Sequence, residues 1–251
     1  MGHTVRRVHL ATFRCYATLQ DFLPATRFRG AFEYPFDGHP SVKDALEAIG
    51  VPHPEVDLVL VNGAPVAFTH PLQAGDRVSA YPRFHAVDVG DISLVRPAPI
   101  PEPRFLLDTH LGRLAAYVRL AGFDATYGRD WDDETLAETS RRERRILLTR
   151  DVALLKRSVI DHGYYLRHTD PRRQLAEVVE RYDLAAAACP FTRCLRCNGE
   201  IEPVSKATVL DRLPPRTREH YHEFWRCPRC ARVYWKGSHF EWMRRLLAGV
   251  I

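Results

Sequence analysis

The first part of the chain carries short apolar runs that suit strands, interrupted by one helical segment. Ser41 and Asp44 have the spacing of a capping box, which predicts a helix that runs through Ile49. Asn62-Gly63 is typical of a tight hairpin turn. Several strands around one helix predict a small α+β domain. The strands expected in it are residues 5–14, 31–36, 57–61 and 64–68, and a last strand that ends near Tyr81.

Farther along the chain, short unbroken apolar runs alternate with segments in which apolar residues recur at helical spacing. Ile146 to Thr149 contains no polar alternation, which indicates a strand buried on both faces of a parallel sheet. Apolar residues between Leu111 and Val118 recur at i, i+3, i+4 and i+7, as on one face of a helix. The alternation predicts an α/β fold, a parallel sheet with covering helices. Its expected strands are residues 104–107, 123–127, 146–149 and 164–166.

A proline-rich stretch separates these two regions. Proline occupies every second position from Pro97 to Pro103, which favours an extended, semi-rigid spacer. The predicted organisation is an N-terminal domain at 1–84, a linker at 85–103, an α/β domain at 104–188 and a cysteine-bearing ribbon with a C-terminal helix at 189–251.

Composition narrows the classes of protein. The 251 residues carry a net charge of +5 with a pI near 9.0, which suits an anionic partner without identifying one. No stretch approaches the roughly 18 apolar residues of a membrane span. Arg14, Asp21 and Arg27 interrupt any apolar core of a signal peptide, so we expect a cytoplasmic protein with no membrane partner.

Four of the six cysteines form two CxxC pairs, Cys194/Cys197 and Cys227/Cys230. Paired knuckles of this spacing predict a closed, structural Zn²⁺ site with four thiolate ligands. The 29 residues between the pairs exceed the usual spacing of a compact ribbon, so an insertion is expected there. Disulfides are the less favoured alternative in a cytoplasmic protein. The remaining two cysteines, Cys15 and Cys189, are expected to be buried.

Three aspartates follow predicted strands or open helices beside them: Asp108, Asp133 and Asp151. Because the strands of a parallel sheet bring their carboxyl ends to one edge, these carboxylates are candidates for one site. Clustered carboxylates repel unless a cation bridges them, and Mg²⁺ or Mn²⁺ prefers such oxygen ligands. The alternative is structural, because Asp133 and Asp151 are well placed to cap helices, whereas Asp108 is poorly placed to do so. Asp130 or Asp132 could replace Asp133.

Arginines and aromatic residues are interleaved around the cysteine pairs, as in Phe224-Trp225-Arg226 and Tyr234-Trp235-Lys236. Cations can contact phosphates while aromatic faces stack on unpaired bases, which would suit RNA. Alternatively, at least half of these aromatics form the small core of the ribbon. The run of arginines from Arg141 to Arg145 is interpreted as cations at a helix C-terminus.

The N-terminal region resembles the ubiquitin-like β-grasp of the ThiS/MoaD sulfur carriers. The resemblance rests on Leu60-Val61-Asn62-Gly63, on Pro71-Leu72 and on Gly75-Asp76-Arg77-Val78. Those carriers are activated on a C-terminal Gly-Gly, whereas this chain continues through Arg83-Phe84-His85. A binding or docking module for a protein or ribosome therefore suits this domain better than sulfur transfer.

The region from about Arg104 to Leu247 resembles the Mut-seven C-terminal RNase domain family, which has a PIN-like nuclease fold. An N-terminal ubiquitin-like domain is a known arrangement in that family. The resemblance implies metal-dependent RNA hydrolysis with Asp108, Asp133 and Asp151 at the acidic positions; the fourth acid of many PIN domains has no match. The alternative is a non-catalytic RNA- or ribosome-binding protein. The motifs that carry the resemblance are Phe105-Leu-Leu-Asp108, Leu111-Gly-Arg-Leu114-Ala, Leu120-Ala-Gly122-Phe-Asp124, Asp133-Glu-Thr-Leu136-Ala, Ile146-Leu-Leu-Thr-Arg-Asp151, Arg193-Cys-Leu-Arg-Cys-Asn-Gly199, Cys227-Pro-Arg-Cys230 and Tyr234-Trp-Lys-Gly-Ser-His239.

Overall fold

A computed structural model describes residues 8–27, 30–84 and 89–251. The chain divides into two compact units, each of which is described separately. Unit 1 joins the chain up to Pro99 with Asp151–Tyr165, and unit 2 joins Ile100–Arg150 with Leu166–Ile251. The predicted fold class is confirmed: a β-rich N-terminal domain, a parallel sheet flanked by helices, and a C-terminal ribbon with clustered cysteines.

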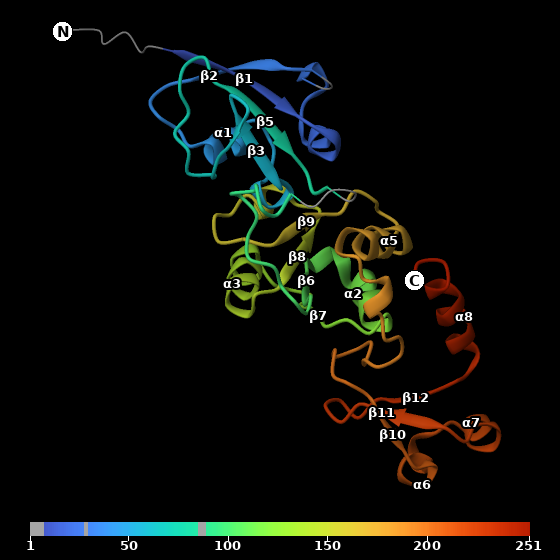
Figure 1. Cartoon of the computed structure of the whole chain (residues 1–251). Helices are drawn as coiled ribbons and strands as arrows, with labels where there is room; N and C mark the ends of the chain where they lie inside the picture. Colours follow the sequence, from blue (N-terminus) through green and yellow to red (C-terminus); the bar gives the residue numbers. More distant parts are fainter. Residues whose placement is uncertain (1–7, 28–29, 85–88) are drawn as a thin grey trace. The chain divides into compact units, whose positions relative to one another are not determined.

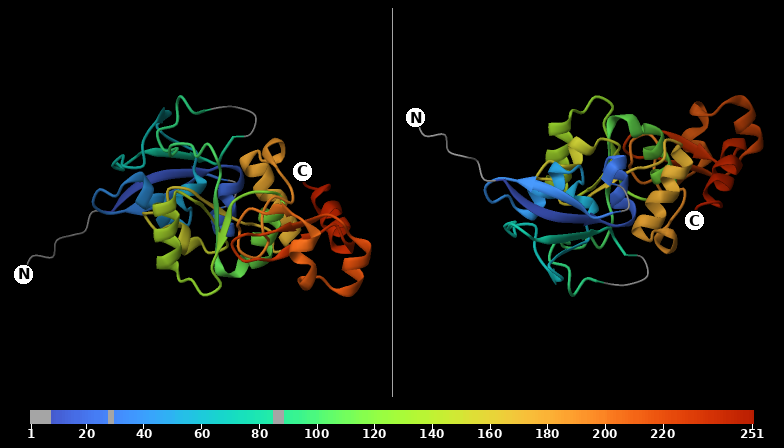
Figure 2. Two further views of the ribbon diagram at one scale, coloured as in Figure 1. Left: turned by 90° about the horizontal axis from the view of Figure 1, so that it is seen from below. Right: turned by 90° about the horizontal axis from the view of Figure 1, so that it is seen from above.

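Unit 1 is built on a five-stranded sheet with the order β2-β1-β5-β3-β4 (Figure 1). The central strands β1 and β5 run parallel, while β1 and β2 form an antiparallel pair. The same strands can be followed from two further sides in Figure 2. The helical and strand elements of this unit are β1 (His9–Cys15), β2 (Phe32–Phe36), α1 (Val42–Ala48), β3 (Leu58–Val61), β4 (Ala64–Pro65), β5 (Arg77–Tyr81), α4 (Val152–Leu155), β9 (Gly163–Tyr165) and the 3₁₀ turns η1 (Ala17–Phe22), η2 (Ala25–Arg27) and η3 (His53–Glu55).

Local signals in the sequence account for these elements. Both halves of the predicted capping box form, because the Ser41 hydroxyl accepts from the N–H of Asp44 and the Asp44 carboxylate accepts from the N–H of Ser41. Asn62 and Gly63 have φ values of 52° and 89°, as the predicted hairpin turn requires. The returning strand is shorter than expected, since β4 ends at Pro65.

The segment 151–165 packs on the ubiquitin-like part of unit 1 through buried polar groups. His53 is 6% exposed, and its Nε2 lies 2.8 Å from the carbonyl oxygen of Ile160. The carboxylate of Glu55, which is 2% exposed, accepts the N–H of Tyr165 at 2.6 Å. Lys156 donates to the carbonyl of Glu47 at 2.7 Å. Buried polar groups are costly unless they are paired, so these bonds specify one arrangement of the segment.

Unit 2 contains three parallel strands with the order β7-β6-β8, and their register pairs Leu107 with Tyr127 and with Leu148. Figure 1 shows α3 on one side of β6 and β8, with α2 and α5 together on the other. The strand Ile146–Thr149 is buried at all four positions, as predicted. The elements of this part are β6 (Phe105–Leu107), η4 (Thr109–Leu111), α2 (Gly112–Leu120), β7 (Ala125–Tyr127), α3 (Asp133–Glu143), β8 (Ile146–Thr149), α5 (Pro171–Tyr182) and η5 (Ala185–Ala187).

The C-terminal part of unit 2 is a three-stranded antiparallel ribbon in the order β10-β11-β12. The predicted insertion between the cysteine pairs forms short helices. In the final helix, Leu246 and Leu247 are buried, whereas Trp242 is 45% exposed. Within the described residues, none of the helices is both long and apolar enough to span a bilayer. The elements here are β10 (Glu202–Val204), α6 (Lys206–Val209), η6 (Leu210–Arg212), α7 (Pro215–His220), β11 (Phe224–Arg226), β12 (Val233–Trp235) and α8 (Ser238–Leu247).

Candidate functional site

Asp108 lies at the carboxyl end of β6, where the strand leaves the sheet. Its N–H donates to the carbonyl of Leu148 at 3.1 Å, which sets it beside the end of β8. The residue is 8% exposed. A carboxylate this buried needs hydrogen-bonding partners or a cation.

Three hydrogen bonds orient the Asp108 carboxylate. Oδ1 accepts the N–H of Thr109 at 2.5 Å and the Thr109 hydroxyl at 3.2 Å, and Oδ2 accepts the hydroxyl of Thr149 at 2.5 Å. Asp108 is therefore the N-cap of the 3₁₀ turn η4, and the prediction that it is poorly placed to cap is wrong. The prediction failed because the helix is preceded by a tighter turn that begins at Thr109. An ionised carboxylate has about four acceptor positions, so these bonds leave capacity on Oδ2 for a cation.

The end of β7 supports the turn that follows Asp108. The Tyr127 hydroxyl donates to the carbonyl of Thr109 at 2.8 Å. A Cβ at Gly112 would lie 2.8 Å from the same hydroxyl oxygen, so any larger residue here would displace the Tyr127 side chain. These contacts fix the backbone of the turn that follows Asp108.

Asp133 is exposed in the first turn of α3. Asp132 is the N-cap of this helix, because its carboxylate accepts the N–H of Thr135 at 2.8 Å. The alternative that Asp133 itself is the cap is therefore wrong by one residue. The side chain of Asp133 is left for solvent or a ligand, while Asp130 is also exposed.

Asp151 is exposed and caps α4 in unit 1. Its Oδ1 accepts the N–H groups of Ala153 at 2.7 Å and Leu154 at 3.2 Å, which confirms the structural alternative for this residue. In the described ranges, three or more candidate ligand side chains gather only at the four cysteines, and that set includes no aspartate. A metal-ligand role of the aspartates stays a prediction.

The four cysteine sulfurs of the ribbon lie within 4.8 Å of one another. Cys194 and Cys230 are separated by 3.5 Å between their Sγ atoms, and Cys197 and Cys227 by 3.4 Å. These distances exceed the roughly 2.05 Å of a disulfide, and the cysteines are free. They are close to the edge of about 3.8 Å that a tetrahedron with metal–sulfur bonds of about 2.3 Å would have. The donor set therefore fits one tetrahedral metal ion.

Both cysteine pairs sit on knuckles with the same backbone pattern. In the first knuckle the N–H of Asn198 donates to the carbonyl of Cys194, and in the second the N–H of Ala231 donates to the carbonyl of Cys227. Asn198 and Ala231 both have left-handed φ values, 68° and 58°. The two turns therefore match, and together they present the four sulfurs to one point.

Charge in the cluster also favours a cation. Burial raises the pKa of the Cys194 thiol, but hydrogen bonds from the Tyr234 hydroxyl and from backbone N–H groups outweigh burial and lower the pKa to about 6. Burial and the neighbouring sulfurs raise the pKa of Cys197 to about 12. Several thiolates at this spacing repel one another, so all four ionise together only around a bridging cation.

The two remaining cysteines differ from each other. Cys15 is buried as predicted, and burial raises its pKa to about 12. Cys189 is exposed, so the prediction that it is buried is wrong. Its N–H donates to the carbonyl of Ala121, which anchors the backbone while the side chain points outward.

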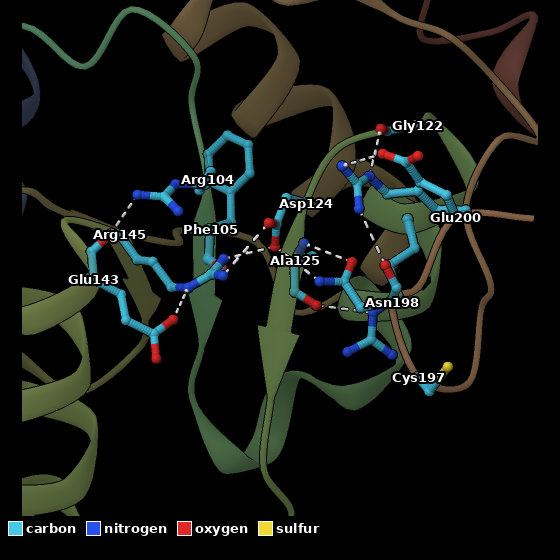
Figure 3. Close-up of polar contacts among 12 residues, drawn as sticks. Arg104, Phe105, Gly122, Asp124, Ala125, Glu143, Arg145, Cys197, Asn198 and Glu200 are labelled. Atoms are coloured by element: carbon cyan, nitrogen blue, oxygen red, sulfur yellow. Dashed lines mark hydrogen bonds and ion pairs between the residues drawn. The ribbon is translucent and has the colours of Figure 1, made fainter. Parts of the chain in front are cut away.

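Polar contacts fasten the first knuckle to the parallel sheet (Figure 3). Asn198 donates to the Asp124 carboxylate at 2.7 Å and accepts the N–H of Ala125 at 3.0 Å. Arg145 also donates to Asp124, at 2.6 Å, and to Glu143 at 2.6 Å. Sequence reasoning missed this network. Arg145 was interpreted as a cation at the end of a helix, but it is 7% exposed and forms a buried ion pair.

A second arginine completes the attachment of the ribbon. Arg119 of α2 is 5% exposed and donates to the carbonyls of Leu195 and Arg196 in the knuckle, at 3.0 and 3.1 Å. Its Nε donates to the carbonyl of Ala125 at 2.8 Å. The ribbon and the parallel sheet are therefore joined through side chains that satisfy backbone groups on both sides.

The aromatic residues of the ribbon divide between its two faces. Phe224 and Trp235 pack with Val209 and Leu213 in a small core, as the structural alternative predicted. Trp225 and Tyr234 are paired across β11 and β12 and belong to the opposite face.

The fold and site together define a class: an α/β domain with a buried aspartate at a strand end, joined to a ribbon whose four clustered cysteines could hold a metal ion. Residues 103–247 match the family model described as the Mut7-C RNAse domain, and residues 8–88 match the Mut7-C ubiquitin model. The first match covers more than half of the chain, and the chain belongs to the Mut7-C RNAse domain family. Comparisons with curated proteins and with solved structures gave no match.

Proposed function

We propose that this protein is a divalent-metal-dependent ribonuclease that hydrolyses RNA phosphodiester bonds. The observation that carries the proposal is the match to the RNase domain family over residues 103–247. Asp108, a buried carboxylate at the end of a parallel strand, supports it. In this proposal Asp108, Asp133 and Asp151 provide carboxylate ligands for Mg²⁺ or Mn²⁺.

The residues at the end of β6 suit such a role. The Thr109 N–H and the Thr149 hydroxyl hold the Asp108 carboxylate in one orientation while leaving it further acceptor capacity. Asp133 presents an exposed carboxylate in the first turn of α3. A bound divalent cation would supply charge stabilisation for the scissile phosphate and lower the pKa of an attacking water.

The four cysteines are proposed to hold Zn²⁺ in a structural site. Four protein sulfurs complete a tetrahedron and leave no position open for water, so this metal would stabilise the ribbon without hydrolysing RNA. Reduced, metal-binding cysteines suit a cytoplasmic location, which forms part of the proposal. The ribbon would help to hold RNA, and the ubiquitin-like domain would contact a protein partner or the ribosome.

A second candidate is a non-catalytic RNA- or ribosome-binding protein on the same scaffold. One observation favours it: within the described residues, neither Asp108 nor Asp133 belongs to a set of three or more candidate ligand side chains. Two carboxylates that are not gathered in a ligand set would retain the fold without holding a catalytic ion.

A cleavage assay separates these candidates. Purified protein is incubated with single-stranded and with hairpin RNA, without added metal, with Mg²⁺, with Mn²⁺ and with EDTA. Zinc content is measured after the EDTA step, so that loss of the ribbon metal is not mistaken for loss of catalysis. Cleavage that requires Mg²⁺ or Mn²⁺ supports the ribonuclease. RNA retention without cleavage under every condition supports the binding protein.

A further inference from the structure

A cavity of about 290 Å³ opens between the ribbon, the end of α2 and the C-terminal helix α8, all within unit 2. Its walls are largely aromatic and apolar, with two cations, Arg193 and Lys236, also lining it. This volume is at the small end of the range for ligand pockets. The walls include Phe191, Trp225, Tyr234, Trp235, Phe240 and Met243.

The ribbon uses only one of its faces for its small core, which leaves aromatic residues of the other face to line the cavity. The insertion between the cysteine pairs supplies Val209 and Leu213, which cover the face that bears Phe224. Alternation along the strands places Trp225 and Tyr234 on the other face, where they form a cross-strand pair. These two rings are therefore not needed for the small core of the ribbon.

Polar contacts fix the walls before any ligand arrives. The Tyr234 hydroxyl lies 3.1 Å from the Cys194 sulfur, and it accepts the N–H of Leu195 at 3.1 Å. On the far wall, the rings of Phe191 and Phe240 pack with centroids 4.5 Å apart. Rigid aromatic walls keep the entropic cost of binding a flat ring small.

The charged groups at the cavity suit an anion attached to that ring. Lys236 lies 5.3 Å from the centre of the Trp225 ring and pairs at 2.8 Å with Glu223. Both of these side chains are half exposed or more, so their ion pair stabilises little and can be exchanged for a phosphate. Arg193 is 22% exposed and donates to the carbonyls of Gly122 and Asn198 at 3.1 Å each, which fixes its guanidinium at the cavity, 3.6 Å from the exposed acid Glu200.

We infer that this cavity is a binding site for one unpaired nucleobase of RNA, with Lys236 and Arg193 facing its flanking phosphates. The inference rests on the proposed function and names the class of substrate: single-stranded RNA. Aromatic faces stack on bases of any sequence, whereas a base inside a duplex is already stacked and paired. A cavity of this size takes one base and not a base pair.

The test is a binding measurement without added Mg²⁺ or Mn²⁺, so that it does not depend on cleavage. Fluorescein-labelled oligouridylate of about 10 nucleotides, in the range of site sizes for single-strand binding, is titrated by anisotropy. A fully paired RNA and an abasic strand of equal length serve as comparisons. We expect the oligouridylate to bind more tightly than either.

Trp225→Ala and Phe240→Ala remove rings from opposite walls, and each is expected to weaken oligouridylate binding about 10- to 100-fold. Trp225→Phe should restore most of the affinity. Trp242→Ala is the matched control, because this tryptophan is on the same helix as Phe240, is 45% exposed and does not line the cavity. Zinc content and circular dichroism confirm that each variant is folded.

Equal affinity of all variants for oligouridylate would overturn the inference, and so would equal binding of the abasic strand. Displacement of the oligonucleotide by an apolar peptide and not by a mononucleotide would assign the cavity to a protein partner instead. Base-dependent binding without cleavage in any metal would refute the ribonuclease and leave the pocket standing. Metal-dependent cleavage, together with unchanged oligouridylate binding by Trp225→Ala and Phe240→Ala, would support the ribonuclease and refute the base-binding cavity.

Discussion

Three hydrogen bonds determine how the Asp108 carboxylate points, and the one to Oδ2 comes from a side chain on the neighbouring strand. The Thr149 hydroxyl donates to Oδ2 at 2.5 Å from a fully buried position. Thr149→Val removes this donor with little change in volume, so a metal ligand would lose its orientation. We expect kcat for RNA cleavage to fall about 10- to 100-fold, as for other residues that orient metal ligands.

Thr149→Ser keeps the hydroxyl and is the matched control, for which kcat within a few-fold of the wild type is expected. The KM for RNA should be unchanged in both variants, because Thr149 is not placed to touch substrate. Equal kcat for the valine and serine variants would show that the orientation of Asp108 has no part in the reaction.

The Asp124 carboxylate should make the stability of the folded protein depend on pH. Burial acts to raise the pKa of its carboxyl, but hydrogen bonds from Arg145 and Asn198 outweigh burial and hold the pKa below the usual 3.8. The unfolded chain therefore takes up a proton first as the pH falls. The stabilisation from this carboxylate is fully present above pH 3.8 and is lost as the pH falls through the lower, folded pKa.

Urea unfolding between pH 3 and pH 6 measures this contribution. Asp124→Asn should be less stable than the wild type at pH 6, and the difference should shrink toward pH 3. Asp211→Asn is the control, since Asp211 is an exposed carboxylate in η6, outside the network of Asp124. A difference between Asp124→Asn and the wild type that is constant over this range would contradict the assignment.

At the scale of elements, the sequence was sufficient to predict the structure wherever neighbouring residues determine it. The capping box at Ser41, the turn at Asn62-Gly63 and the buried strand Ile146–Thr149 were all predicted and are confirmed. The cysteine spacing likewise predicted that the four sulfurs meet, because each knuckle closes within a few residues.

Partners that are distant in the sequence could not be predicted in this way. In the sequence, Arg145 is one more arginine of a charged run, and only the structure shows its ion pair with Asp124. Asn198 reads as a turn residue, although its side chain also fastens the ribbon to β7. The cap at Asp132 was missed because three neighbouring aspartates have the same local chemistry, and only the backbone conformation selects among them.

The segment 151–165 is an element whose position rests on such a distant partner. Glu55→Ala leaves the partly buried N–H of Tyr165 without this acceptor, which should cost about 1 kcal/mol of stability. We expect faster hydrogen exchange at residues 163–165 than in the wild type. Glu55→Gln keeps an acceptor oxygen and should protect these amides partly, while Glu33→Gln, an exposed site on β2, should change nothing. Unchanged exchange in Glu55→Ala would contradict this role.

At the scale of the whole molecule, we expect the ribbon to depend on a bound metal and the ubiquitin-like domain to be independent of it. Native mass spectrometry should find one zinc per chain. Its removal by a chelator should unfold the ribbon, because four ionised sulfurs are not tolerated at these distances without a cation. Near-ultraviolet circular dichroism should lose signal from the ribbon tryptophans, while hydrogen exchange in β1, β3 and β5 stays slow.

Cys227→Ser should bind zinc weakly and resemble the stripped protein, and Cys189→Ser, at an exposed cysteine outside the cluster, should resemble the wild type. A chain that keeps a folded ribbon after complete loss of metal would show that the cysteines do not form a structural site.

The proposed role of Asp108 as a ligand for a catalytic divalent metal can be tested by kinetics. The rate of RNA cleavage is measured as a function of Mn²⁺ concentration for the wild type, Asp108→Asn and the control Asp170→Asn. We expect metal-dependent cleavage by the wild type and the control. For Asp108→Asn we expect a loss of at least about 100-fold, comparable to the loss of other catalytic groups, with zinc content and folding intact. Cleavage by Asp108→Asn at the wild-type rate would show that Asp108 is not such a ligand.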